Sequence, residues 1–436
     1  MIPLSHRPDV LLMLIRLAIA VLLTCAVFVP TSVTAQAADS DLARARRILR
    51  TTPLIDGHND LAWRIRQDKS APHDVDVYDL RGTTPGHTDL ARMKEGMVGA
   101  QFWSVDIPGD IKDSGYARVQ LEEIDIARRF IARYPERLAF ATRASDIRRD
   151  FAQHEVASFL GMEGGHAIEN SLGALRAYYD LGVRYMTLTH NVTLDWADAA
   201  LDEPKHGGLT PFGKEVVREM NRLGMLVDLA HVSPGTMSAA LDVSEAPVIF
   251  SHSGSRALVD HPRNVPDSIL ARVPKNGGIV MVPFVNSFVS ATVRAHDVAE
   301  EQALKSAKAK FPSDTAAVER EMAAWRTAHP PVRASRSDVA DHIEHVRDVA
   351  GIDHVGIGSD FDGIDDVIPG LENVSRFPYL LAELARRGWS DADLRKVAGE
   401  NFIRVFTQAE IVAARSQKTR HPSTATITEL DGKLHP

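Results

Sequence analysis

Polar and apolar positions along the chain repeat as one unit: an amphipathic helix, a glycine, and a short apolar strand that ends in a polar residue. Three helices are predicted, each with a capping Ser or Thr before it and a glycine after it: 172–181 (Ser171, Gly182), 211–223 (Thr210, Gly224) and 338–350 (Ser337, Gly351). The strands that follow them run into His190, His231 and Asp360. Strands that alternate with helices at this spacing predict parallel pairing through βαβ units.

The predicted strands are apolar along almost their whole length, as expected when both faces of a sheet are covered. Their polar residues gather at the carboxyl ends. Both a (β/α)8 TIM-type barrel and a doubly wound open sheet assemble their sites at that end of the strands. We favour the barrel, because it brings residues from the first and last strands around one axis.

The segment 293–334 breaks this pattern, since it is rich in Ala, Glu, Lys and Arg and stops at Pro330-Pro331. It predicts a helical hairpin inserted into the barrel. A solvated surface decoration is the default interpretation of the hairpin. A lid over the site and a contact in a homodimer are the alternatives, because an insertion after a strand end lies on the active face.

The N-terminus predicts an export signal. Arg7 and Arg16 precede the apolar run 17–29, which is short for a bilayer span, and Ala35-Gln36-Ala37 suits a signal peptidase. We interpret 1–37 as cleaved, 38–412 as the barrel and 413–436 as a polar tail. The mature protein would be periplasmic or secreted by a bacterium, with an uncleaved membrane anchor as the alternative.

Composition narrows the function classes. The 436 residues include 25% charged and 44% hydrophobic positions, which is ordinary for a globular protein. The formal net charge is −8 and no Lys/Arg stripe is present, which argues against nucleic acid and anionic membranes as partners. Cys25, the single cysteine, lies in the predicted signal, so the mature chain has no disulfide or catalytic thiol. The expected partner is a small molecule.

Metal-suited side chains recur at the ends of separate apolar runs: His58, Asp60, Glu163, His231, His252 and, as a sixth candidate, Asp360. Imidazole and carboxylate together suit zinc or a similar first-row ion. Five such ligands, with one carboxylate as a bridge, are enough for two metals about 3.5–4 Å apart. One His-x-Asp pair is a weak signal in a chain with 18 histidines. The occurrence of all six residues at the ends of apolar runs, however, predicts a hydrolase that uses a metal-bound hydroxide.

Eight longer stretches occur in one order between Asp56 and Phe406: IDGHNDL, GMEGGHAI, RYMTLTHN, LVDLAHVS, SHSGSRAL, HPRNVPD, GIGSDFDG and GENFIRVF. On these stretches the chain resembles the membrane (renal-type) dipeptidases, a branch of the binuclear amidohydrolase barrels. The resemblance covers nearly the whole predicted mature chain. It implies hydrolysis of L-Xaa-Xaa dipeptides, tolerance of a C-terminal D-residue, and β-lactam hydrolysis as a side activity.

The resemblance also implies a ligand set. His58 and Asp60 would bind one zinc ion, His231 and His252 the other, and Glu163 would bridge the two. The nucleophile would be a hydroxide that bridges both ions.

Three further residues take roles from the resemblance. His190 would polarise the scissile carbonyl, Arg263 would hold the C-terminal carboxylate, and Asp360 would bind the substrate ammonium and carry a proton to the leaving amine. Val285 stands where a pocket tyrosine is expected. A lactonase or N-acyl amino acid hydrolase on the same metals is the first alternative function, and a non-catalytic periplasmic binding protein is the second.

Overall fold

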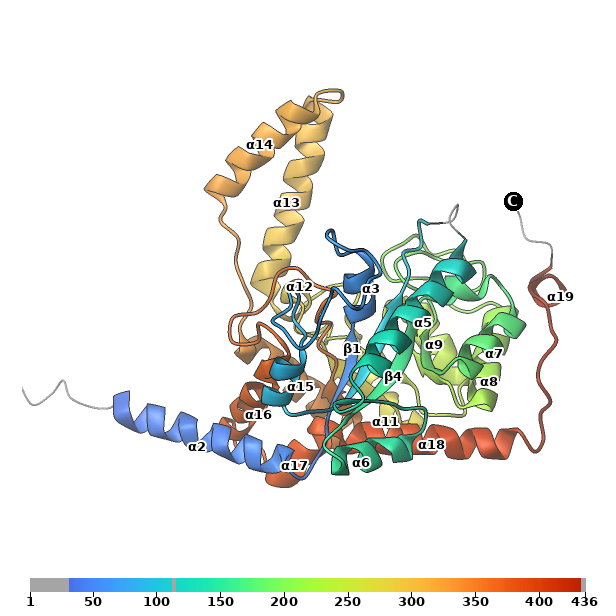
Figure 1. Ribbon diagram of the computed structural model, residues 1–436. Coiled ribbons are helices and arrows are strands. Elements are labelled where there is room, and N and C mark those ends of the chain that lie inside the picture. Colours follow the sequence, from blue (N-terminus) through green and yellow to red (C-terminus); the bar gives the residue numbers. More distant parts are fainter. Residues whose placement is uncertain (1–30, 112–114, 433–436) are drawn as a thin grey trace, which may run out of the picture.

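The computed structural model describes residues 31–111 and 115–432 (Figure 1). Within this part of the chain, eight parallel strands close into a barrel in the order β1–β2–β4–β5–β6–β7–β8–β9, and β9 pairs with β1. The strands are β1 (Leu54–Asn59), β2 (Val98–Asp106), β4 (Val156–Glu163), β5 (Val183–Thr187), β6 (Leu226–Asp228), β7 (Ile249–Phe250), β8 (Ile279–Val282) and β9 (Val355–Ile357). A short extra strand, β3 (Leu138–Phe140), pairs with the start of β4. The predicted (β/α)8 TIM-type barrel is confirmed.

Helices between the strands cover the outside of the barrel. They are α3 (Leu61–Arg66), α4 (Leu90–Glu95), α5 (Tyr116–Arg133), α6 (Ala144–Ala152), α7 (Leu172–Asp180), α8 (Pro211–Leu223), α9 (Pro234–Val243), α10 (Asp267–Leu270), α11 (Val273–Asn276), α15 (Arg336–Ala350), α16 (Phe377–Arg386) and α17 (Asp391–Arg395). Ser171 and Thr210 cap α7 and α8 as predicted. The predicted cap of α15 is wrong, because Ser335 instead forms a reciprocal capping box with Asp338.

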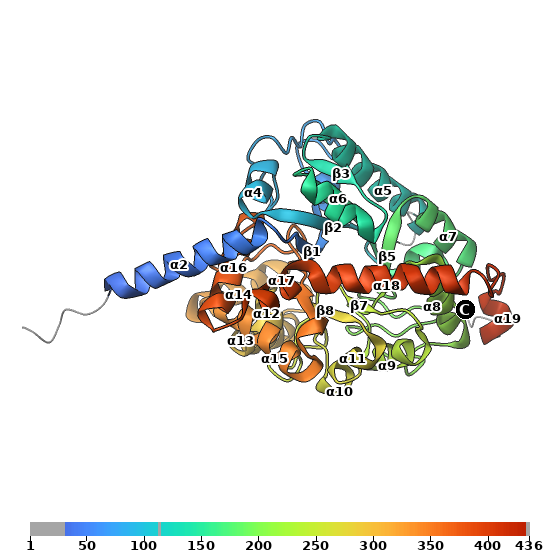
Figure 2. The ribbon, with the colours of Figure 1, turned by 90° about the horizontal axis from the view of Figure 1, so that it is seen from below.

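An aromatic core fills the barrel below the carboxyl ends of its strands. The rings of Phe102, Phe159 and Tyr185 stack inside it, with centroids 4.9 and 5.2 Å from that of Phe102. Helix α18 (Asn401–Ser416) crosses the opposite end of the barrel (Figure 2). Phe402 of this helix packs against Phe102 in an edge-to-face arrangement, with ring centroids 5.2 Å apart. Helix α18 therefore closes the barrel at the amino ends of the strands, and the functional residues gather at the carboxyl ends.

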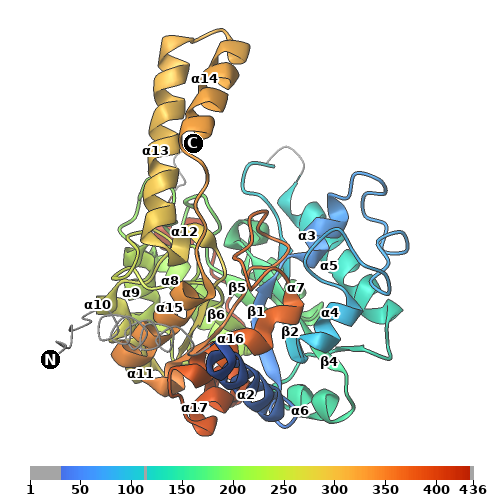
Figure 3. The ribbon, with the colours of Figure 1, turned by 90° about the vertical axis from the view of Figure 1, so that its left-hand side faces the viewer.

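The predicted insertion is a helical hairpin of α13 (Ala291–Lys310) and α14 (Thr315–Ala328), which follows the short helix α12 (Asn286–Val289). It stands out from the barrel (Figures 1 and 3). The two helices bury a small apolar seam, and Glu300 pairs with Arg326 at 2.6 Å across it. At the base, Asn286 donates to the carbonyl of Asp366 and accepts from the amide of Ala334, which ties both ends of the hairpin to the barrel.

Helix α2 (Thr31–Leu49) opens the described part of the chain and lies outside the barrel wall. Residues 1–30, most of the predicted signal, are outside the described residues. Arg44 on α2 pairs with Asp391 on α17 at 2.7 Å. Within residues 31–111 and 115–432, no helix is both long and apolar enough to cross a bilayer.

The C-terminal segment is docked on the barrel. Helix α18 continues to Ser416, so the boundary expected after residue 412 falls inside a helix. Beyond it, α19 (Ile427–Asp431) lies against α8. The carboxylate of Asp431 accepts from the Thr210 hydroxyl at 2.6 Å and from the Phe212 amide at 2.9 Å. This carboxylate lies at the N-terminus of α8, where a helix favours negative charge.

Candidate active site

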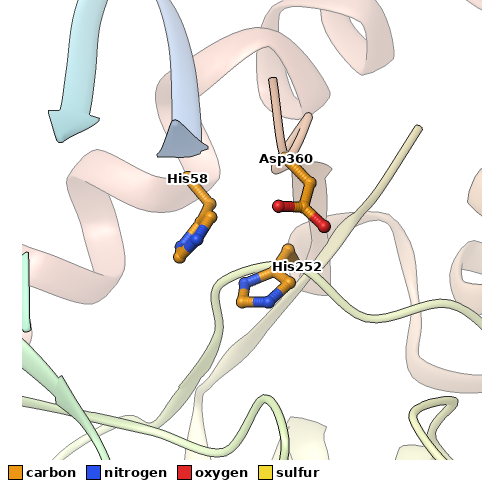
Figure 4. Close-up of side chains that lie close together, drawn as sticks. All are labelled: His58, His252 and Asp360. Atoms are coloured by element: carbon orange, nitrogen blue, oxygen red, sulfur yellow. The ribbon is translucent and has the colours of Figure 1, made fainter. Parts of the chain in front are cut away.

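The strand ends bring the predicted residues together around one cavity of about 360 Å³. Its lining includes Asp60, Glu163, His190, His231, His252, Arg263, Val285 and Asp360. His58 comes from β1, His252 follows β7 and Asp360 follows β9, and the three side chains face one another (Figure 4). Residues separated by some 300 positions in the sequence thus share one site because the barrel closes.

Glu163 lies at the centre of the candidate ligands. Its Oε2 is 3.3 Å from His58 Nε2, while its Oε1 is 2.8 Å from His231 Nε2 and 3.4 Å from His252 Nε2. Asp60 Oδ2 lies 3.3 Å from the same nitrogen of His58. Each oxygen of the Glu163 carboxylate therefore faces a different pair of candidate ligands. Oε2 faces His58 and Asp60, and Oε1 faces His231 and His252.

The donor atoms fit divalent cations. His58 Nε2 and Asp60 Oδ1 are buried and have no hydrogen-bond partner among the described residues. His231 Nε2 and His252 Nε2 lie 3.0 Å apart. Buried polar atoms without partners are costly, and two facing imidazole nitrogens need a proton or a metal ion between them. A divalent cation beside each ligand pair satisfies these atoms.

Neighbouring side chains fix the orientation of all three imidazoles. His231 Nδ1 lies 3.0 Å from Asn191 Oδ1, His252 Nδ1 lies 2.8 Å from Ser251 Oγ, and His58 Nδ1 lies 2.8 Å from Tyr185 Oη. Asn191 Oδ1 can only accept, so His231 carries its proton on Nδ1 and presents a lone pair on Nε2. The sequence prediction missed these supporting residues.

Burial and the charges of the site set the protonation states of His231, His252 and Glu163. Burial lowers the pKa of His231 and His252 well below the usual range, and the Arg263 guanidinium adds to this shift. Burial works against ionisation of Glu163, but His58 and His190 outweigh it and hold its pKa well below the usual range. The two imidazoles are therefore neutral and the carboxylate is charged, which are the states that coordinate a cation.

Arg263 is a buried cation with unused donors. Its side chain lies over the Phe288 ring at 5.1 Å, and its Nη2 approaches the His252 carbonyl at 3.5 Å. Its Nε has no hydrogen-bond partner among the described residues, although only 4% of the residue is exposed. Burial lowers its pKa to about 10, so it stays charged at neutral pH. The guanidinium fork is available for an anionic ligand.

Asp360 and His231 are held in left-handed backbone conformations, with φ of 67° and 64°. Non-glycine residues in this region carry strain, which collects at functional sites. Burial raises the pKa of Asp360 well above the usual range. The site therefore contains a carboxyl group that can hold a proton near neutral pH.

His190 lies against His231, with ring centroids 4.5 Å apart. Its Nδ1 is 3.5 Å from Asp106 Oδ1. Asp106, the last residue of β2, was missed by the sequence prediction, although it too closes an apolar run at a strand end.

A profile of the membrane dipeptidases, peptidase family M19, matches residues 42–420. The chain belongs to this family. It is therefore a metallodipeptidase, and the predicted resemblance to membrane dipeptidases is confirmed. Family membership also implies that this membrane dipeptidase uses metal, in agreement with its clustered His, Asp and Glu side chains.

Solved structures share the barrel of this membrane dipeptidase. The probable dipeptidase PvdM from Pseudomonas aeruginosa is 24% identical, with a TM-score of 0.73 over 86% of this chain and 100% of that chain. The dipeptidase AC, a metallopeptidase, is 25% identical, with a TM-score of 0.67 over 82% of this chain and 99% of that chain. A metallopeptidase from Rhodobacter sphaeroides, liganded with a phosphinate mimic of L-Ala-D-Ala, is 24% identical, with a TM-score of 0.66 and the same two coverages.

Proposed function

We propose that this membrane dipeptidase uses two zinc ions to hydrolyse the peptide bond of L-Xaa-Xaa dipeptides. His58 and Asp60 would hold one ion, His231 and His252 the other, and Glu163 would bridge them. The observation that carries this proposal is the position of Glu163, whose two oxygens face the two ligand pairs separately. Two divalent cations would supply a nucleophile at neutral pH by acidifying water.

The residues around the ligands suit a zwitterion of fixed length. The fork of Arg263 would bind the substrate's C-terminal carboxylate through two parallel hydrogen bonds. Asp360 would pair with the ammonium group and pass a proton to the leaving amine. Anchoring both termini selects dipeptides, because a longer peptide leaves one charge unpaired in a buried site.

His190 would donate a hydrogen bond to the carbonyl oxygen as negative charge develops on it. Only part of its side chain, 16%, is exposed, so the donor works in a largely water-excluded site. Donors that are already in place there stabilise an oxyanion far better than they do in water.

We also propose that a D-residue is accepted at the C-terminal position. The Rhodobacter sphaeroides structure, which shares this fold, contains a phosphinate mimic of L-Ala-D-Ala. Val285 and Phe288 line the cavity here, so the substrate meets an apolar wall beside Arg263. This wall can accept side chains without demanding a hydrogen bond from them.

The experiment that tests the function compares four substrates on the purified protein: an L,L-dipeptide, its L,D-diastereomer, the N-acetylated dipeptide and a tripeptide. The proposal expects cleavage of the first two, loss of both after chelation, and kcat/KM at least about 100-fold lower for the others. Faster cleavage of the N-acetyl form would instead favour an N-acyl amino acid hydrolase.

We further propose that the mature protein begins after Ala37 and is exported. The support is the order of charged, apolar and small residues in 1–37. Whether the projecting hairpin mediates a homodimer stays a prediction, which light scattering of the purified protein tests.

A further inference from the structure

Asp106 differs from two other buried aspartates of the barrel, Asp56 and Asp228. Asp56 accepts hydrogen bonds from the Ser359 amide and hydroxyl, both at 2.7 Å, and Asp228 accepts from the Ser251 amide at 2.8 Å and hydroxyl at 2.6 Å. These carboxylates fix strand ends. Asp106 Oδ1 is equally buried, yet it has no hydrogen-bond partner among the described residues. A structural role of the same kind therefore does not explain it.

The surroundings of Asp106 are those of the active site. It lines the catalytic cavity, it is only 8% exposed, and it pairs in register with Glu163 on the adjacent parallel strand. Two neighbouring carboxylates repel each other, and burial increases the cost. A side chain retained at such a position needs a partner that compensates for this cost.

His190 is that partner. Its Nδ1 lies 3.5 Å from Asp106 Oδ1, while its Nε2 lies on the opposite side of the ring, 3.4 Å from Asn191 Nδ2. An acidic side chain beside Nδ1 fixes the orientation of the imidazole and therefore the direction in which Nε2 points. The ring also contacts His231, so a small rotation of it would disturb the geometry of the whole cavity.

We propose that Asp106 is a positioning residue, which holds the His190 ring through Nδ1 and directs Nε2 toward the scissile carbonyl. The inference rests on the proposed role of His190 in dipeptide hydrolysis and deepens it. Asp106 contacts neither substrate nor reacting atoms in this account, and its effect passes entirely through His190.

The competing role is that of a further metal ligand, since the ligand atoms of Asp106, Glu163 and His190 lie within 4.8 Å of one another. The two roles differ in their consequences. A ligand changes how much metal the protein retains, whereas a positioning residue changes the turnover of a fully loaded enzyme and the orientation of one ring.

The kinetic test uses Asp106→Leu, Asp106→Asn, His190→Asn and the double variant Asp106→Leu/His190→Asn on L,L-dipeptides. A misplaced catalytic group costs about 100-fold. We therefore expect kcat of Asp106→Leu to fall about 30- to 100-fold with KM within about twofold, and Asp106→Asn, whose side-chain amide can still hydrogen-bond to Nδ1, to recover most of it. In the His190→Asn background, Asp106→Leu should cost less than about twofold. Asp365→Asn, on a side chain that is 96% exposed, is the matched control for loss of one negative charge.

Two further measurements do not depend on activity. Elemental analysis should give the same metal content for wild type and both Asp106 variants, and a crystal structure of Asp106→Leu should show the His190 ring turned from its wild-type position. Loss of metal, an unmoved ring, or multiplicative losses in the double variant would each overturn the inference. An inactive wild type with a turned ring in Asp106→Leu would count against the proposed function and leave the positioning contact standing.

Discussion

Replacement of Arg263 by alanine isolates the recognition of the substrate carboxylate. Arg263 is 4% exposed, and its Nε has no hydrogen-bond partner among the described residues, so truncation breaks few contacts within the protein. The main effect falls on the substrate, whose carboxylate would enter a buried cavity unpaired. Removing one partner of a buried charge pair costs about 2–5 kcal/mol. We therefore expect a loss of about 3 kcal/mol, which is about 150-fold in kcat/KM.

The assay compares a dipeptide with its C-terminal amide, which lacks the carboxylate. Wild type should prefer the free acid by about the same 150-fold, and Arg263→Ala should lose this preference, because the mutation and the amide remove the same interaction. Arg263→Lys should recover only part of it, since an ammonium cannot form the bidentate contact. Arg256→Ala is the control, because Arg256 pairs with Asp260 at 3.2 Å in the same loop. An Arg263→Ala enzyme within twofold of wild type on free dipeptides would refute the reasoning.

Four other experiments test the metal bridge, a helix cap, a buried histidine and the export signal. Glu163→Gln should lower both metal retention and kcat/KM, the latter by about 10³-fold or more, and full metal content with wild-type turnover would contradict the bridge. Ser335→Ala should lower the free energy of unfolding by about 1 kcal/mol in urea titrations, because it removes the capping box of α15. Ser337→Ala, at the exposed second position of the same helix, should lower it by less. Burial lowers the pKa of His342 from 6.5 to about 4, so the unfolded chain takes up a proton at a higher pH than the folded protein does. Protonation of this residue should therefore lower the free energy of unfolding by roughly 2 kcal/mol at pH 5 relative to pH 7.5. If the pH dependence of stability were the same in His342→Gln as in wild type, His342 would not be its source. N-terminal sequencing of the exported protein should begin at residue 38, directly after Ala37, and a start at residue 1 would contradict cleavage.

The sequence was sufficient for the barrel and for the candidate metal ligands at its strand ends. Glycine stops, capping residues and apolar strands that end in polar side chains are local signals, and parallel pairing carries all strand ends to one face. His58, Glu163 and Asp360 could be named for this reason, and the family resemblance added Arg263. The hairpin was also visible, because its composition departs from the surrounding repeat.

The supporting contacts could not be predicted, because they join residues that no local pattern connects. Tyr185 lies 127 positions from His58, whose Nδ1 it contacts, and within its strand it resembles any buried aromatic residue. Asp106 closes an apolar run as the ligands do, but its relation to His190 depends on how three strands pack. The cap of α15 was misplaced because two serines, Ser335 and Ser337, lie at the start of the helix, and only the reciprocal bond to Asp338 distinguishes them.

Zinc titration of the chelated protein, with dipeptide hydrolysis measured at each addition, counts the metal ions that the site needs for activity. We expect activity to return with added zinc and to reach its plateau at two equivalents per chain, because Glu163 would join the two ligand pairs into one working site. A plateau at one equivalent, or activity that chelation never removed, would contradict the binuclear site.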